Sequence, residues 1–315
     1  MRIAIFGAGG IGGYLGGRLS QAGEEVVLIA RGEHLTAIKD HGLRVDSVKG
    51  DFVATPALAT DNPTEAGVVD VVILGVKAWQ VVDAAMAMRP MVGPETFVVP
   101  MQNGVEAPDQ LVSVLGEKAT MVGLGGLISY IVGPGHIRHA GGEPFVTFGE
   151  TDNSVTERSQ NLLRAFQNAG VQASIPSNIY AALWGKLAFM AANSGVGAIT
   201  RVPSGQWRSL AGSWEMAENV VKEVLAVASC KGITMPGDAL SSALSRLEGS
   251  PPSGTSSMQR DLMDGRPSEL EVQNGGVVRL GLEVGVPTPV NSFIYNSLLP
   301  QEMKARSQFP KVESE

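Results

Sequence analysis

The chain has 315 residues, of which 44% are apolar and 17% charged, with 24 basic residues, 31 acidic residues and a net charge of −7. This length predicts about two globular domains, and the composition excludes long disordered regions. The acidic balance argues against a nucleic-acid partner. The single cysteine, Cys230, excludes an intramolecular disulfide and a cysteine-cluster metal site, and we expect no metal.

The N-terminus carries no leader pattern. Met1 and Arg2 run directly into the apolar stretch Ile3–Phe6, which predicts a strand, so we expect no targeting segment. The most apolar stretch, Val68–Val76, is interrupted by Asp70 and is much shorter than the ~20 residues of a membrane span. We therefore expect a cytoplasmic protein with no membrane partner.

Short apolar runs alternate with helical patterns in the first part of the chain. The predicted strands are Arg2–Phe6, Glu25–Ala30, Val69–Val76 and Thr96–Pro100, and a helix is predicted over Tyr14–Ala22. Leu43–Val45 and Phe52–Ala54 predict a small hairpin. Continuous apolar strands that alternate with helices are typical of an α/β fold with a doubly wound, Rossmann-type parallel sheet.

The pattern changes after Met121. Glycines and short strands follow as far as Glu150, and we expect antiparallel strands that close the same sheet. A helix is predicted over Ser154–Ala169. The predicted domains are 1–176, which binds the cofactor, and 177–315, which is all-helical and holds the substrate. Residues after Pro300 are polar, and we expect them to fray.

A glycine turn follows the first predicted strand. Gly7-Ala8-Gly9-Gly10-Ile11-Gly12 fits G-x-G-x-x-G and opens a helix, which is the context of a dinucleotide-binding turn. Gly7 would permit the tight turn, Gly9 the approach of a pyrophosphate, and Gly12 close packing of helix on strand. The alternative is a glycine-rich turn without a ligand.

The second predicted strand ends at Arg31. An NAD site usually has an acidic residue here to bind the ribose 2′-hydroxyl, whereas a guanidinium binds a 2′-phosphate. We therefore predict NADP(H) as the cofactor. The alternative is a solvated surface arginine.

Two further loops lie at the carboxyl ends of predicted strands, where ligands bind in such sheets. Gly75–Gln80 contains Lys77, and Pro100–Gly104 contains Asn103. Either side chain could reach the cofactor or a carbonyl group. The alternatives are a surface lysine at a helix start and a plain Asn-Gly turn.

One lysine lies in a helix that is otherwise apolar. Ile179–Ser194 contains a single charge, Lys186, and helical spacing places Met190, Asn193 and Ser194 on roughly the same face. Burial lowers the pKa of a lysine towards neutrality, which suits a proton donor to a carbonyl group under reduction. A lysine whose ammonium group reaches water is an equally supported alternative.

A buried ammonium group needs a carboxylate. Glu269 and Glu271 are candidates at the start of a helix predicted from Pro267, with an apolar stripe that begins at Leu270. Spacing alone favours solvated carboxylates that complement the helix dipole.

The sequence resembles the ketopantoate reductases (2-dehydropantoate 2-reductases) over nearly its whole length. The resemblance is specific because several motifs occur in the same order and spacing. They are Gly7–Gly12, Lys77-Ala78-Trp79-Gln80, Gln102-Asn103-Gly104, Trp184-Gly185-Lys186-Leu187, Ser256–Asp261, and Glu269-Leu270-Glu271 followed by Asn274-Gly275.

The resemblance implies reduction of 2-dehydropantoate to (R)-pantoate by NADPH, in the biosynthesis of pantothenate and coenzyme A. It implies catalytic roles for Lys186 and Glu269. The cofactor-binding residues implied are Gly7, Gly9, Gly10, Ile11, Gly12, Arg31, Lys77, Gln80 and Asn103. The substrate-binding residues implied are Asn103, Lys186, Asn193, Ser257 and Glu269.

The sequence departs from the family's pattern on the lysine helix. Many members carry asparagines four and eight residues after the lysine, where this chain has Met190 and Ser194, with Asn193 one place early. Two alternatives follow, a reductase of another branched 2-oxo acid and a non-catalytic NADPH sensor. A homodimer is left open.

Overall fold

The computed structural model describes residues 1–309, which form two compact units. Unit 1 contains Met1–Gln102 and Glu106–Ile179, and unit 2 contains Asn103–Val105 and the chain from Tyr180 onward. Each unit is described by itself below. The predicted division into a cofactor-binding domain, 1–176, and a helical substrate domain, 177–315, stays a prediction.

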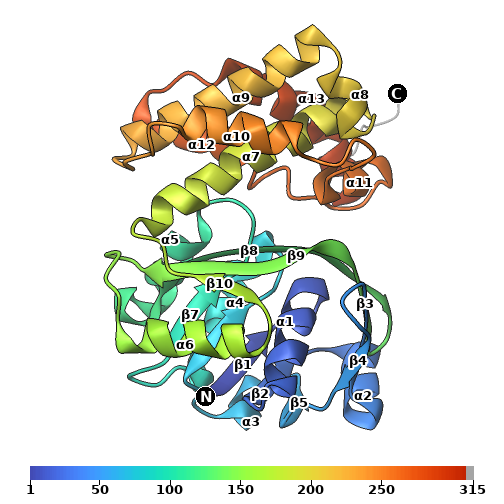
Figure 1. Cartoon of the computed structure of the whole chain (residues 1–315), viewed down its shortest axis with the longest axis vertical. Helices are drawn as coiled ribbons and strands as arrows, with labels where there is room; N and C mark the ends of the chain where they lie inside the picture. Colours follow the sequence, from blue (N-terminus) through green and yellow to red (C-terminus); the bar gives the residue numbers. More distant parts are fainter. Residues whose placement is uncertain (310–315) are drawn as a thin grey trace, which may run out of the picture. The chain divides into compact units, whose positions relative to one another are not determined.

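A five-stranded parallel sheet forms the centre of unit 1 (Figure 1). The strand order is β5-β2-β1-β6-β7, and all pairs are parallel, which confirms the predicted doubly wound sheet. The strands are β1 (Arg2–Phe6), β2 (Glu25–Ile29), β5 (Leu58–Thr60), β6 (Val71–Leu74) and β7 (Phe97–Pro100).

Both faces of this sheet are covered, which explains its continuous apolar strands. Ile3 and Ile5 belong to one apolar cluster, and Ala4 and Phe6 belong to another on the opposite face. The helices are α1 (Gly10–Gln21), α2 (Gly32–His41), α3 (Pro63–Ala66), α4 (Val81–Ala87) and α5 (Ala107–Leu115), and the short turns are η1 (Ala78–Gln80), η2 (Arg89–Met91) and η3 (Glu117–Ala119).

The strands after Met121 do not close the parallel sheet, so that prediction is wrong. They form a second sheet of order β10-β9-β3-β4, in which β8 pairs antiparallel with β9. The strands are β3 (Leu43–Ser47), β4 (Phe52–Ala54), β8 (Met121–Gly133), β9 (His136–Glu150) and β10 (Gln172–Ser174). The hairpin of β3 and β4 is confirmed, and its free edge accepts β9 in parallel. Alternation along a strand indicates its faces but does not specify its partner, which is why the pairing was missed.

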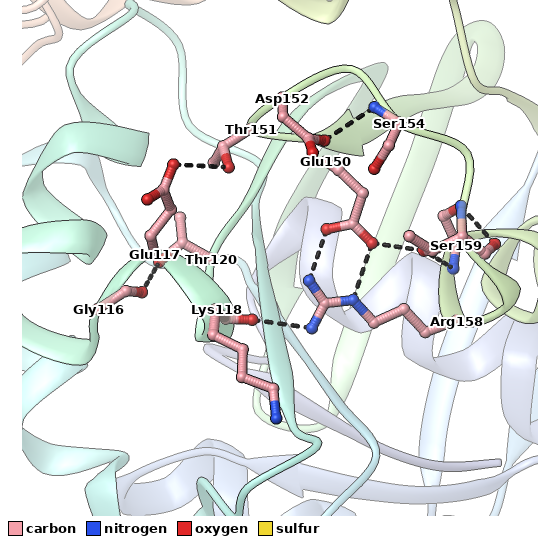
Figure 2. Close-up of polar contacts among 11 residues, drawn as sticks. Gly116, Glu117, Lys118, Thr120, Glu150, Thr151, Asp152, Ser154, Arg158 and Ser159 are labelled. Atoms are coloured by element: carbon pink, nitrogen blue, oxygen red, sulfur yellow. Dashed lines mark hydrogen bonds and ion pairs between the residues drawn. The ribbon is translucent and has the colours of Figure 1, made fainter.

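An ion pair joins the end of β9 to helix α6 (Glu157–Asn168), as Figure 2 shows. Arg158 Nη2 and Nε lie 2.5 and 2.8 Å from the two carboxylate oxygens of Glu150. Thr156, the N-cap of α6, also donates its hydroxyl to Glu150 at 2.5 Å. Arg158 Nη1 donates to the carbonyl of Lys118, and its guanidinium lies 5.2 Å from the centre of the Phe97 ring.

We expect Glu150→Ala to destabilise the protein by about 2 to 3 kcal/mol, since Arg158 would lose its carboxylate while partly buried. The value lies below the roughly 3 to 5 kcal/mol of a fully buried pair because the Arg158 side chain is 26% exposed. The measurement is urea denaturation followed by circular dichroism. The control is Lys118→Ala, which breaks a pair with Glu95 in which both side chains are exposed, and which we expect to cost under about 1 kcal/mol. Equal small losses in both variants would contradict the prediction.

Unit 2 is built from helices, and residues 180–309 contain no strand, as predicted. The helices are α7 (Ile179–Thr200), α8 (Ser204–Arg208), α9 (Ala211–Cys230), α10 (Ala239–Glu248), α11 (Ser257–Met263), α12 (Asn274–Val284) and α13 (Pro289–Ala305).

Two predictions for this unit are wrong. The helix expected from Pro267 begins only at Asn274, and Glu269 lies in the turn before it. The chain after Pro300 does not fray at once, because α13 continues through that proline to Ala305. Glu302, in this last part of α13, is buried, and the buried carboxylate holds the helix end in place. The final residues, 310–315, lie outside the described part of the chain.

No helix within residues 1–309 combines the length and the apolar character needed to cross a bilayer.

Candidate functional site

The glycine turn between β1 and α1 is built on close backbone contacts. Gly7 has φ +101°, and a Cβ there would lie 2.9 Å from the backbone nitrogen of Val76. A Cβ on Gly12 would lie 2.2 Å from the carbonyl oxygen of Gly7. The predicted roles of these two glycines, the tight turn and the close packing of helix on strand, are therefore confirmed.

The start of α1 has the properties of an anion-binding site. Gly9 is the N-cap, no side chain caps the helix, and a Cβ on Gly9 would meet no atom within 4 Å. The first amides of α1 thus lack the usual side-chain acceptor, and the space next to Gly9 is open. Gly10 has a different constraint, since a Cβ there would lie 2.4 Å from the carbonyl oxygen of Ser129 on β8.

His34 on α2 fixes the glycine turn, and the sequence analysis did not identify it. Its Nδ1 accepts a hydrogen bond of 3.0 Å from the amide of Gly135. The proton is therefore on Nε2, which lies 2.9 Å from the carbonyl oxygen of Ala8 in the turn. A histidine three residues after Arg31 gives no signal in the sequence, because its two partners are backbone groups.

The polar residues predicted near the cofactor lie at the carboxyl ends of the parallel strands. Arg31 is the exposed N-cap residue of α2, and no residue within 1–309 forms an ion pair with it. Lys77 is exposed beside the Trp79 ring, and Gln80 Oε1 accepts from the Lys77 amide at 3.2 Å. Gln102, which the sequence analysis named as part of a motif without a role of its own, donates to the carbonyl groups of Leu74 and Val76.

These features fit a phosphorylated dinucleotide. An uncapped helix start and an open glycine suit the pyrophosphate, and an exposed arginine at the end of β2 suits a 2′-phosphate. Within residues 1–309 no three His, Cys, Asp or Glu side chains cluster as metal ligands.

In unit 2, helix α7 has one accessible stripe. Between residues 182 and 193, five residues are partly exposed, and they fall within an arc of about 140° around the helix. They are Ala182, Gly185, Phe189, Met190 and Asn193. All other residues in this range are buried. Lys186 lies in the middle of this arc, and Asn193, seven residues on, lies only about 20° from it around the helix. Ser194 lies off the stripe, fully buried, and its Oγ has no hydrogen-bond partner within the described residues.

Lys186 is buried, with 8% of its surface exposed, so the alternative of a lysine that reaches water is not supported. Burial lowers the pKa of its ammonium group to about 8. The negative charge of Glu269 opposes this shift, and the positive charge of Arg246 adds to it. The ammonium group is therefore mostly protonated at neutral pH, and its pKa lies only about one unit above that pH.

Glu269, not Glu271, is the carboxylate that acts on the lysine. Its Oε2 accepts a hydrogen bond of 2.7 Å from Asn103 Nδ2. Glu271 is engaged elsewhere, with Arg279 at 3.1 Å and the Tyr295 hydroxyl at 2.9 Å. Lys186, Glu269 and Asn103 thus form one polar group in unit 2.

The turn that carries Glu269 is held by residues that the sequence analysis did not identify. Glu302 on α13, 1% exposed, accepts hydrogen bonds from the amide and the hydroxyl of Ser268, at 3.0 and 2.6 Å. Arg306 donates to Glu302 at 2.6 Å and to the carbonyl oxygen of Ser268 at 2.9 Å. Gly104 also packs closely against this turn. Its φ is +89°, and a Cβ there would lie 2.7 Å from the carbonyl oxygen of Val272.

Ser257 and Met190 are not linked to this group by any described hydrogen bond. Ser257 is exposed at the first position of α11, and its neighbour Ser256 caps the helix by accepting from the Gln259 amide at 3.0 Å. Met190 is partly exposed on the stripe of α7.

A Rossmann-type sheet with a dinucleotide-binding turn, together with a helical unit that buries a lysine, defines a nicotinamide-dependent oxidoreductase. The chain belongs to the ketopantoate reductase family. The family described as ketopantoate reductase PanE/ApbA matches residues 3–153, and its C-terminal counterpart matches residues 178–302.

Individual relatives span the whole chain. A 2-dehydropantoate 2-reductase of Mesorhizobium japonicum is 32% identical over 92% of this chain and 94% of its own. The crystal structure of a PanE/ApbA family ketopantoate reductase from Ralstonia eutropha JMP134 is 34% identical and has a TM-score of 0.88 over 97% of this chain and 100% of its own. D-mandelate dehydrogenase with NADH and anilino(oxo)acetate shares the fold, with a TM-score of 0.87 at 24% identity over 97% of this chain and 99% of its own.

Proposed function

We propose that this protein reduces 2-dehydropantoate to (R)-pantoate with NADPH, in the biosynthesis of pantothenate and coenzyme A in the cytoplasm. The observation that carries the proposal is the buried Lys186 with a lowered pKa, next to a carboxylate that is held by Asn103. The relatives named 2-dehydropantoate 2-reductase support the choice of substrate.

The residues of unit 2 have complementary roles in this reaction. When bound, NADPH supplies the hydride for the C2 carbonyl of the substrate. The Lys186 ammonium group stabilises the negative charge that develops on the carbonyl oxygen and donates the proton that completes the alcohol. Glu269 binds the substrate hydroxyl and keeps the lysine in place, and Asn103 orients Glu269. Asn193 lies on the same stripe as Lys186 and orients the substrate, with Ser257 as a further contact.

The residues of unit 1 hold the cofactor in this proposal. Gly7, Gly9, Gly10, Ile11 and Gly12 form the pyrophosphate turn, and Lys77 and Gln80 follow the end of β6. Asn103, which belongs to unit 2, follows the end of β7 and is a further cofactor contact in this proposal. Arg31 selects the phosphorylated cofactor, because a guanidinium attracts a 2′-phosphate and no carboxylate of the described chain forms an ion pair with it.

A second candidate is a reductase of a different 2-oxo acid. Met190 and Ser194 motivate it, since neither offers the amide groups that many family members place there, and Ser194 is buried. D-mandelate dehydrogenase, which shares the fold, acts on a different 2-hydroxy acid by its name.

A substrate panel tests the proposed function. NADPH consumption is followed at saturating cofactor with 2-dehydropantoate, 2-oxoisovalerate and phenylglyoxylate, and kcat/KM is compared. We expect 2-dehydropantoate to be preferred by at least about tenfold, because Glu269 binds a hydroxyl that the other two acids lack. A higher kcat/KM for 2-oxoisovalerate or phenylglyoxylate would show that 2-dehydropantoate is not the preferred substrate. No turnover with any 2-oxo acid would favour the sensor.

Replacement of Lys186 tests the proposed chemistry. We expect Lys186→Ala to lower kcat by about 10³-fold, since the proton donor and the charge on the carbonyl oxygen are both lost. The Kd for NADPH, measured by fluorescence titration, should change little. The control is Lys222→Ala, which removes an exposed lysine of the same unit that pairs with Glu218. Near-normal turnover in Lys186→Ala would rule out the mechanism.

Replacement of Arg31 tests the choice of cofactor. We expect Arg31→Ala to raise the Kd for NADPH by about 10- to 100-fold, because a charged hydrogen bond to the 2′-phosphate is lost. The Kd for NADH, which has no 2′-phosphate, should stay nearly unchanged. The control is Lys39→Ala, which removes an exposed cation from the same helix. Equal weakening of both cofactors in Arg31→Ala would refute the assignment.

A further inference from the structure

Arg246 on α10 lies against the accessible stripe of α7. Its Cζ lies 4.8 Å from the centre of the Phe189 ring, a cation–π contact, and Phe189 is three residues from Lys186 on that stripe. The residue is exposed as a whole, while partial burial of its guanidinium group lowers the pKa of that group. Its position beside the lysine is also evident in the pKa of Lys186, which Arg246 lowers.

The charges around this stripe do not cancel. The charges that act on Lys186 are one carboxylate, Glu269, and one further cation, Arg246. Glu269 already accepts a hydrogen bond from Asn103, and within residues 1–309 no carboxylate forms an ion pair with Arg246. A guanidinium without an ion-pair partner on this stripe is complementary to an anionic group of a ligand.

We propose that Arg246 binds the carboxylate of the 2-oxo acid substrate, and so selects acids over neutral carbonyl compounds. This inference rests on the proposed function. A planar guanidinium can donate two parallel hydrogen bonds to a carboxylate, and the contact with the Phe189 ring holds it beside the stripe. In a 2-oxo acid the carboxylate is bonded directly to the carbonyl carbon. A cation beside Lys186 is therefore placed to bind one group while the lysine faces the other.

A different role for Arg246 would leave a different signature. As a purely electrostatic neighbour it would only hold down the pKa of Lys186, and its loss would change the pH dependence of every substrate alike. As a carboxylate ligand its loss also raises the KM of substrates that carry a carboxylate, and it leaves the KM of an uncharged substrate nearly unchanged.

The experiment compares Arg246→Leu with the wild-type enzyme on 2-dehydropantoate and 2-oxoisovalerate, and on methyl 2-oxoisovalerate, which has no charge. We expect the KM for both acids to rise about 30-fold with kcat nearly unchanged, and kcat/KM for the ester to stay within twofold. Arg246→Lys should recover part of the loss, since it restores charge without the paired donors. The control Arg279→Leu removes an arginine that pairs with Glu271 instead.

Equal losses of kcat/KM for acids and ester would overturn the proposal, and so would no loss for the acids. A shift of the pH profile that is common to all three substrates is expected, because Arg246 also lowers the pKa of Lys186. If the wild-type protein reduces no 2-oxo acid, the proposed function fails, and the inference is then tested by calorimetric titration with 2-oxoisovalerate. Binding that is lost in Arg246→Leu and kept in Arg279→Leu supports a carboxylate site, and binding that is unaffected by either change contradicts it.

Discussion

The central constraint on this protein is the burial of one ammonium group in an apolar helix. Removing a lysine from water is costly, and the fold offsets that cost with the charge of Glu269 without cancelling it. The balance leaves the pKa of Lys186 near 8, where the group is charged at neutral pH yet gives up its proton readily. A complete ion pair would hold the proton too tightly, and an uncompensated lysine would not stay charged.

Several contacts within unit 2 hold Glu269, the carboxylate that acts on Lys186, in position. Glu269 lies in a turn, not on a helix, so its position depends on the contacts of Ser268 with Glu302 and Arg306. Asn103 supplies the hydrogen bond that orients its carboxylate. The neighbouring Glu271 is paired with Arg279 and Tyr295 instead, so two glutamates that are close in sequence have different surroundings.

The sequence allowed the prediction of features that depend on local pattern. The parallel sheet, the glycine turn, the hairpin and the helical second unit follow from apolar periodicity and from the positions of glycines. Partners across long distances could not be predicted. Nothing near Met121 indicates that β9 pairs with β3, and nothing near Pro300 indicates that Glu302 is buried against Ser268. The same limit applies to His34, Asn103 and Arg246, whose partners are backbone atoms or side chains far away along the chain. The apolar setting of Lys186 was visible in the sequence, but the choice between Glu269 and Glu271 required coordinates.

The most direct test of this account is the pKa of Lys186 in the folded protein. Selective labelling of lysine at Cε allows a titration by NMR, with the Lys186 signal assigned by its absence in Lys186→Arg. The account predicts a midpoint at about pH 8, since burial outweighs the charge of Glu269. A midpoint near 10.5, the value of a lysine in water, would contradict it.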